Sequence, residues 1–235
     1  MLELADLSEI ADPAILDPKI TGKRDRLLFP KEMKAILPLL VLPEPGKGGS
    51  LAIDLRPIAM RFILLTLSRR SEVETLKWGQ IDLDVRTWTR EVKAKEEVRT
   101  VTHPLSDAVV ALLKTLPGYI TRQPEEFVFP NRAAGPLGNW DRACDKIKSQ
   151  SKTSDWHRHD LRRSVATLLA KFGVSEAIVD TLLSHSNAFS KGNTSAAAAA
   201  YIMLSTQMKG LPDPLRDAVN QLADILLGLE NGEIG

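Results

Sequence analysis

The stretch from Trp156 to Ser164 constrains this chain most, because it places two histidines and three arginines at the start of an apolar helical pattern. The apolar residues that predict a buried stripe recur at helical spacing: Leu161, Val165, Leu168 and Phe172. Gly173 ends the predicted helix, which has no clear side-chain cap at its start. The helix is therefore expected to carry a strongly basic first turn on an apolar body.

His159 and Arg162 are the residues of this turn that could share one ligand. Residues three apart on a helix are neighbours, so an imidazole and a guanidinium at this spacing can face the same group. A planar fork of donors beside an imidazole suits a phosphate. The alternative is that the arginines make solvated ion pairs and that His159 is an ordinary boundary histidine.

Composition describes an ordinary globular chain of 235 residues, 43% hydrophobic and 26% charged. We expect one domain with appendages. The apolar runs are too short to cross a membrane, and the N-terminus lacks a basic-then-apolar signal pattern. The single cysteine, Cys144, excludes an internal disulfide and a cysteine cluster for zinc. These features predict a cytoplasmic protein.

The formal net charge of +1 hides an uneven distribution. Residues 1–18 carry five acids and no base, and residues 205–235 carry five acids and two bases. In the segment between them, the remaining 29 basic residues exceed the remaining 20 acidic ones by nine. A basic body with acidic ends is compatible with a nucleic-acid partner.

The pattern of elements predicts a mainly helical α+β fold with a small three-stranded antiparallel sheet. Residues 81–103 alternate and are rich in Val, Thr and Trp, which favours strands, and the polar run 93–97 would form a hairpin tip. Helices are expected over these ranges: 29–40, 53–67, 107–117, 137–147, 176–183 and 215–227. Polar loops are expected at residues 43–50 and 148–155.

The motif from His159 to Ser164, followed by an alanine- and leucine-rich helix, resembles the central motif of the tyrosine recombinases, or phage integrases. A second string supports this resemblance. Arg69-Arg70-Ser71-Glu72 is followed by Leu-Lys-Trp and Ile-Asp, which resembles the family's first arginine box. Leu67 and Ser68 stand where the family often has a glycine.

The resemblance implies six catalytic residues: Arg69, Lys93, His159, Arg162, His185 and Tyr201. Lys93 is favoured over Lys95 as the hairpin lysine, although Thr102 and His103 look like extra residues that blur the strand register. His185 matches the family's last phosphate-binding position, with Ser184 in place of the usual glycine. Tyr201 follows five alanines, which predicts a helical mount for the nucleophile.

The implied chemistry is metal-free phosphoryl transfer on double-stranded DNA, with no cofactor. The arginines would clamp the phosphate, the histidines would assist proton transfer, the lysine would protonate the leaving hydroxyl, and Tyr201 would form a 3′-phosphotyrosyl bond. A further group of basic residues could contact the DNA backbone: Arg142, Lys146, Lys148, Lys152 and Arg163. The resemblance further implies nucleoid-associated self-association into a tetramer on paired DNA sites.

The predicted organisation is a lead-in or linker remnant at residues 1–26, a recombinase catalytic domain at 27–210, and a C-terminal helix and tail at 211–235. A separate DNA-clamping domain is missing, so we expect a catalytic-domain fragment. The C-terminal helix carries an apolar seam that could pack on its own domain or on a neighbouring subunit: Leu215, Val219, Leu222, Leu226 and Leu229.

The function that the resemblance implies is site-specific recombination for DNA integration or excision. Two alternatives stay open at this point. A type IB topoisomerase would share the chemistry and relax supercoils, although the compact arginine boxes favour an integrase. A non-catalytic DNA-binding protein would keep the fold without the activity.

Overall fold

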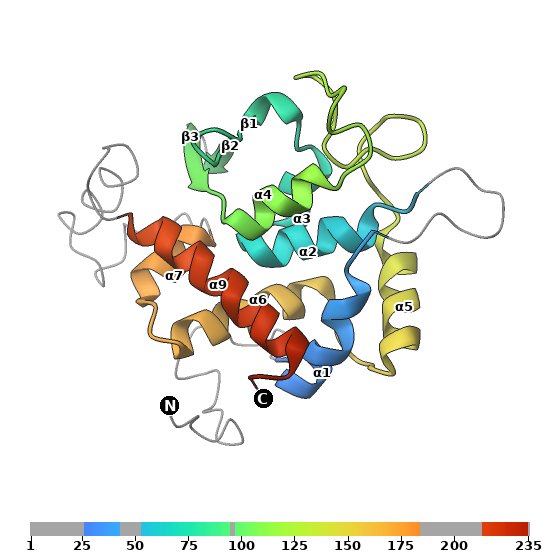
Figure 1. Ribbon diagram of the computed structural model, residues 1–235, viewed down its shortest axis with the longest axis vertical. Helices are drawn as coiled ribbons and strands as arrows, with labels where there is room; N and C mark the ends of the chain where they lie inside the picture. The colour runs from blue at the N-terminus through green and yellow to red at the C-terminus, as the bar shows by residue number, and fades with distance from the viewer. Residues whose placement is uncertain (1–25, 43–52, 95–96, 184–212, 235) are drawn as a thin grey trace.

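The computed structural model describes residues 26–42, 53–94, 97–183 and 213–234, with only the backbone described for 92–94 and 97–99 (Figure 1). Its helical segments are α1 (Pro30–Ile36), η3 (Leu37–Leu39), α2 (Arg56–Thr66), α3 (Arg70–Glu74), η4 (Trp78–Gln80), α4 (Asp107–Lys114), α5 (Trp140–Ser151), α6 (Arg158–Lys171), α7 (Glu176–Leu182) and α9 (Pro214–Asn231). The strands are β1 (Ile81–Asp82), β2 (Thr87–Ala94) and β3 (Glu97–Pro104). The predicted α+β class, mainly helical with a small sheet, is confirmed.

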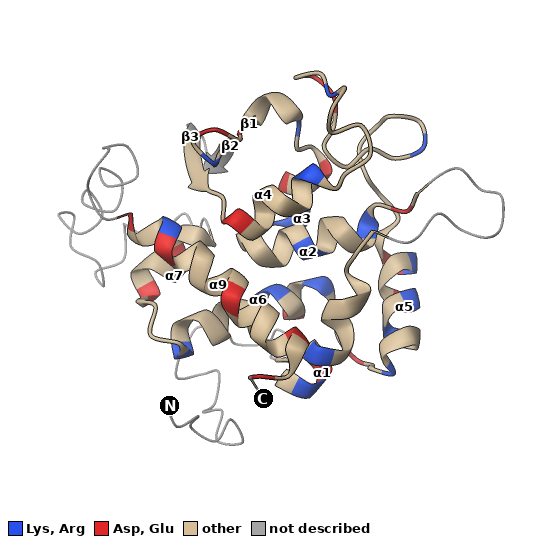
Figure 2. Cartoon of the chain, viewed as in Figure 1, with Lys and Arg blue, Asp and Glu red and all other residues tan. Residues whose placement is uncertain are grey.

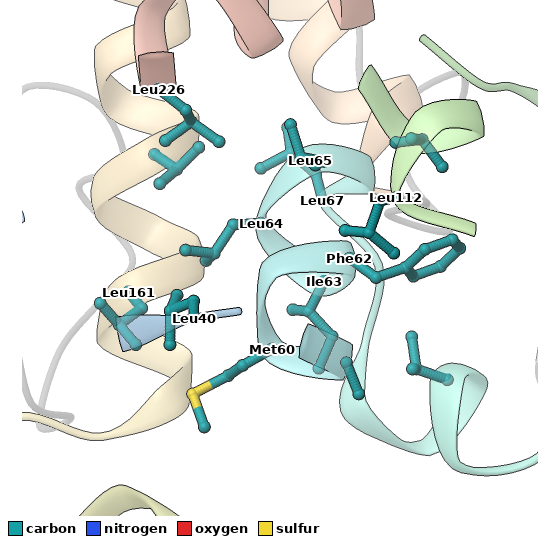
Figure 3. Close-up of a cluster of buried hydrophobic side chains, with 14 of the residues drawn as sticks. Leu40, Met60, Phe62, Ile63, Leu64, Leu65, Leu67, Leu112, Leu161 and Leu226 are labelled. Carbon is teal, nitrogen blue, oxygen red and sulfur yellow. The ribbon is translucent and has the colours of Figure 1, made fainter. Parts of the chain in front are cut away.

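Helix α2 lies at the centre of the fold, as its apolar sequence predicts. It packs against α4, α5, α6 and α9, and Figure 3 shows its side chains meeting Leu161 of α6 and Leu226 of α9. The helix begins at Arg56, with Pro57 in its first turn, and the Asp54 carboxylate accepts a hydrogen bond from the Arg56 backbone amide at 3.1 Å. Each leucine that it buries contributes roughly 1.5–3 kcal/mol of transfer free energy.

The sheet is antiparallel in the order β1-β2-β3. Pairing of β2 with β3 runs without interruption from Thr87 opposite Pro104 to Ala94 opposite Glu97, so these two strands form a hairpin whose last described pair lies within the polar run 93–97. The interpretation of Thr102 and His103 as extra residues was wrong. Thr102 pairs with Thr89, and His103 pairs with Trp88.

Helix α9 buries its apolar seam within this same chain. The seam residues are all at most 5% exposed: Leu215, Val219, Leu222, Leu226 and Leu229. The helix crosses α2 and α6 and contacts α1 and α7 (Figure 1). Glu230 pairs with Arg61 at 2.5 Å, and Gln221 donates to the carbonyl of Phe172 at 2.8 Å. Of the two alternatives, packing on the chain's own domain is the one observed.

One local prediction needs correction. Helix α5 continues to Ser151, where a polar loop was expected from Lys148. Residues 127–130 make two isolated bridges, Lys77 with Phe127 and Pro130 with Pro136. Helix α6 begins without a cap from the His157 side chain, as predicted, and the Asp160 carboxylate accepts the His157 backbone N–H at 2.8 Å.

No helix in the described parts of the chain is both long enough and apolar enough to cross a bilayer.

Candidate active site

Arg162 projects from α6 into the protein and is held there by two backbone carbonyls. Its Nε donates to the oxygen of Leu67 at 2.9 Å, and its Nη2 donates to the oxygen of Leu183 at 2.8 Å. Only 6% of the residue is exposed. Among the described residues no hydrogen-bond partner engages its Nη1, so this arm can serve a ligand.

The turn that supplies the Leu67 carbonyl has the backbone conformation that glycine favours. Leu67 ends α2 with φ 49° and ψ 29°, in the left-handed region. A residue other than glycine costs about 1–2 kcal/mol in this region. Leu67, at a position where the family often has a glycine, is therefore a buried leucine in a strained conformation.

Arg69 and Arg162 lie close enough for their charges to interact. Arg69 is the N-cap residue of α3, two residues beyond Leu67. Burial, and then the positive charges of Arg69 and Arg90, lower the pKa of Arg162 to about 10, while Glu72 opposes this shift. Arg162 therefore stays protonated at neutral pH in a strongly positive surrounding.

Arg90 is a member of this cluster that sequence reasoning missed. It lies in β2 and is 4% exposed, with its guanidinium 4.6 Å from the centre of the Trp88 ring. Its Nη1 donates to Glu72 Oε2 at 2.6 Å. Burial, and then the charge of Arg69, lower the pKa of Arg90. The signal was present, because Trp88 and Arg90 alternate with the exposed Thr89 and Glu91 along the strand.

His103 is a buried residue near these arginines. It is 3% exposed and meets the Trp88 ring edge-on, with the ring centres 6.5 Å apart. Burial, and then the charges of Arg90 and Arg162, lower the pKa of His103 to about 3. Within the described residues its Nε2 has no hydrogen-bond partner. The imidazole is therefore neutral at pH 7 and adds no charge to the cluster.

His159 lies on the first turn of α6 and is exposed, whereas Arg162 is buried one turn further on. Lys93 lies in β2 opposite Val98, one residue before the strand ends. Lys95, His185 and Tyr201 lie outside the described residues. Of the six predicted catalytic residues, the structure thus brings together Arg69 and Arg162, and it leaves His159 accessible on the helix that carries Arg162.

The predicted DNA-backbone contacts gather on α5, which carries a row of basic residues in Figure 2. Arg142 and Lys146 are exposed on this helix, and Lys152 is exposed just after its end. Lys148 is partly buried, with its Nζ 3.6 Å from Asp145 and 5.3 Å from the centre of the Trp156 ring. Arg163 is half-buried on α6.

A groove runs beside α5, between the start of α2 and residues 130–139, with a volume of about 840 Å³. Arg142 and Lys146 line it together with Arg56. Arg56 is engaged by Asp54 at 2.7 Å and by the carbonyl of Asn139 at 2.7 Å. Arg142 and Lys146 of α5 are exposed in this groove, as is Arg132 of the segment 130–139 on its opposite side.

Comparison with known proteins identifies relatives of this chain. The family model described as "Phage integrase family" matches residues 31–193. Prophage integrase IntA of Escherichia coli (strain K12) is 28% identical over 159 residues, which are 66% of this chain and 38% of that protein. The chain thus spans well under half the length of this curated relative.

Solved structures share the fold. The integrase from mycobacterium phage Brujita superposes with a TM-score of 0.58 at 19% identity, covering 93% of this chain and 68% of the other. The XerH site-specific recombinase, bound to its difH substrate in a pre-cleavage complex, gives a TM-score of 0.54 at 19% identity, covering 71% and 48%.

Proposed function

Because the chain belongs to the phage integrase family, we propose that it is a site-specific DNA recombinase that cuts and rejoins strands for DNA integration or excision. Residues 27–210 would form its catalytic domain, with the 211–235 segment packed on it through α9. An enzyme of this kind would act on DNA in the cytoplasm, in association with the nucleoid. The XerH relative, described as bound to its difH substrate, supports a double-stranded DNA partner.

One observation carries the proposal: among the described residues, the charged groups around Arg162 are mostly positive, which suits an anionic ligand. Of the charged groups that act on Arg162, two are the arginines Arg69 and Arg90 and one is the carboxylate Glu72. Three guanidinium groups thus face one carboxylate, in a site where burial strengthens electrostatic attraction. A phosphodiester provides the missing negative charge, and its oxygens match the spacing of guanidinium donors.

In the proposed reaction the Tyr201 hydroxyl attacks the phosphorus, and its oxygen forms the 3′-phosphotyrosyl bond as the bond to the 5′ oxygen breaks. Lys93, or Lys95 as the alternative, gives the departing oxygen its proton. His159 and His185 assist the transfer of the phenolic proton, because a phenol with a pKa of about 10 is a weak nucleophile at pH 7. A 5′ hydroxyl then attacks the phosphotyrosine and rejoins the strand.

Arg69 and Arg162 act on the non-bridging oxygens in this scheme. Two carbonyls fix Arg162 before any ligand arrives, so little reorganisation is needed when negative charge develops on the phosphate. Removing one such donor from an enzyme costs roughly 3 kcal/mol of transition-state stabilisation.

The basic residues of α5 would contact the DNA backbone without reading its sequence: Arg142, Lys146, Lys148 and Lys152. Arg163 of α6 would join them. Such contacts position the protein on the duplex. On paired sites we propose assembly into a tetramer, through surfaces other than the seam of α9, which is already buried.

The test is formation of a covalent adduct. Binding sites would first be selected from a pool of random duplexes, and half-sites with a nick beside the cleavage position would then trap the phosphotyrosine. Tyr201→Phe should abolish the adduct and leave DNA affinity unchanged. Tyr119→Phe is the matched control, because the Tyr119 ring packs against Trp78 and Arg122, contacts that phenylalanine can keep, and this variant should keep the adduct.

Other outcomes would decide against the proposal. An undiminished adduct in Tyr201→Phe would remove the assigned nucleophile. Relaxation of supercoiled plasmid without strand exchange would point to topoisomerase activity. DNA binding with no adduct from any selected half-site would leave a non-catalytic DNA-binding protein.

A further inference from the structure

The Glu72 carboxylate is shared between two arginines of the candidate site. Its Oε2 accepts the Arg69 backbone N–H at 2.6 Å and Arg90 Nη1 at 2.6 Å. Its Oε1 lies at 3.4 Å from Arg69 Nη1. The carboxylate therefore approaches the Arg90 guanidinium more closely than it approaches the guanidinium of Arg69.

The two arginines differ in how they are held. Arg90 is packed on the Trp88 ring in the middle of β2, and 3% of its side chain is exposed. Arg69 has 41% of its side chain exposed. Both line a pocket of about 890 Å³ between α3 and the sheet, together with Glu72 and the exposed Glu91. Arg90 is thus a buried part of the pocket wall, and Arg69 extends into the part of the pocket that a ligand can enter.

A carboxylate this close to Arg69 works against anion binding. A guanidinium that is fully paired with a carboxylate has its donors and its charge already satisfied, and a phosphate must then displace that partner. When a second guanidinium contacts Glu72, it compensates part of the carboxylate's negative charge, and less of that charge acts on Arg69. Glu91 is exposed, so solvent screens its charge much more strongly than that of Glu72.

We propose that Arg90 is a positioning residue: it holds Glu72 through the 2.6 Å contact and keeps this carboxylate from neutralising Arg69, which can then bind an anionic oxygen of the substrate. The proposal rests on the proposed function in taking that anion to be a phosphodiester. Loss of Arg90 lets Glu72 pair fully with Arg69, and the clamp loses both a charge and a donor.

A double substitution separates this role from simple packing. Arg90→Met should lower the rate of adduct formation by at least about tenfold, since the cluster loses one of its two excess positive charges. Adding Glu72→Gln restores that excess and removes the competitor of Arg69. The Arg90→Met/Glu72→Gln protein should therefore regain activity to within about threefold of wild type.

The Arg61–Glu230 pair provides a matched control. It is a half-buried arginine–glutamate pair outside the site, with the two groups 2.5 Å apart. Arg61→Met and Arg61→Met/Glu230→Gln should both cleave at the wild-type rate. If Arg90 acts only through packing, its double variant will be no faster than Arg90→Met, because the second change removes a further contact. That result overturns the inference.

If Arg90→Met fails to fold, Arg90→Lys provides a second test of the inference. Lysine retains the positive charge beside Glu72 but loses the flat stack on Trp88. On our proposal Arg90→Lys keeps cleavage within about threefold of wild type, because compensation of Glu72 is electrostatic. If Arg90→Lys loses cleavage activity while its unfolding midpoint stays unchanged, the shape of the guanidinium matters instead of its charge. That result would overturn the inference.

A binding measurement distinguishes failure of this inference from failure of the proposed function. Inorganic phosphate is titrated into each variant, and its affinity is followed by phosphorus NMR. The expected order is weaker binding in Arg90→Met and recovery in the double variant, whether or not wild type forms an adduct. Equal affinities across the series, or no phosphate binding by wild type, would overturn the inference even where cleavage is normal.

Discussion

Arg162 Nε lies 2.9 Å from the carbonyl oxygen of Leu67, so the residue that ends the central helix also aims the buried arginine of the candidate site. A second carbonyl, that of Leu183 at the end of α7, holds the other side of the guanidinium. Backbone groups of two separate helix ends therefore fix one side chain. Its direction depends on how the fold places these ends.

The first prediction concerns this forked arrangement. Lysine keeps the charge at position 162 but cannot reach two carbonyls and still present a planar fork to a phosphate. Arg162→Lys should lower the rate of adduct formation by about tenfold or more. Arg158→Lys is the control on the same helix, because Arg158 pairs with Asp141 at 2.8 Å, and its rate should match wild type. Arg69→Lys should behave as Arg162→Lys does; near-normal cleavage by both would reduce these arginines to structural ion pairs.

The second prediction tests the strain at Leu67. Removing its buried side chain should cost about 2–5 kcal/mol of unfolding free energy, but glycine also relieves the left-handed conformation. Leu67→Gly should therefore be more stable than Leu67→Ala by about 1 kcal/mol. Leu64 lies within α2 and supplies the control, since there glycine should be worse than alanine by about 1 kcal/mol. Urea unfolding of the four variants measures both differences, and the same order at both positions would refute the assignment of strain.

The third prediction follows from the lowered pKa of His103, about 3 against an ordinary value of 6.5. As the pH falls, His103 of the unfolded chain binds a proton before His103 of the folded chain does. The resulting loss of stability is absent above pH 6.5 and grows down to about pH 3. Wild type should lose roughly 1.4 kcal/mol of stability per pH unit in this window from His103 alone.

His103→Gln cannot titrate and serves as the comparison for this pH effect. Its unfolding free energy should change less than that of wild type between pH 6.5 and pH 4.5, by about 2–3 kcal/mol. Urea unfolding at the two pH values gives the numbers. Parallel changes in the two proteins would mean that His103 is protonated in the folded state.

The fourth prediction concerns α9, where two consecutive leucines differ in burial. Leu226 is 2% exposed and Leu227 is 53% exposed. Leu226→Ala should cost about 2–5 kcal/mol of unfolding free energy, and Leu227→Ala should stay within about 0.5 kcal/mol of wild type. A chain ending at Gly210 should lose cooperative unfolding altogether. A stably folded truncated protein would indicate that the packing of α9 is dispensable.

Much of the fold follows from local pattern. Residues 81–103 alternate strongly enough to predict the sheet, and Asp213 with Pro214 predicts the start of α9, where the Asp213 carboxylate accepts the Arg216 amide at 3.1 Å. The surface on which α9 packs could not be predicted from the local sequence pattern. A narrow apolar seam fits any apolar surface, and only the positions of α1, α2, α6 and α7 determine that the surface belongs to the same chain.

The candidate site divides in the same way. Arg69 and Arg162 stand in recognisable strings, so a resemblance could bring them together. Arg90 and His103 stand in strand segments where polar residues ordinarily face solvent, and their burial depends on strand phase and on what covers the sheet. A charged residue in phase with Trp88 was the one local clue. The lysine of the hairpin, His185 and Tyr201 remain predictions from the sequence.

The packing of α9 has a consequence for synthesis of the chain. Helix α9, which is synthesised after the other described helices, covers apolar faces of α1 and α2, which are synthesised before the rest. At a translation rate of about 5–20 residues per second, those faces wait roughly seven to thirty seconds before α9 is synthesised. A nascent chain with such exposed surface is a substrate for chaperones and proteases during this interval. The yield of active protein should therefore depend on translation speed between residues 66 and 214.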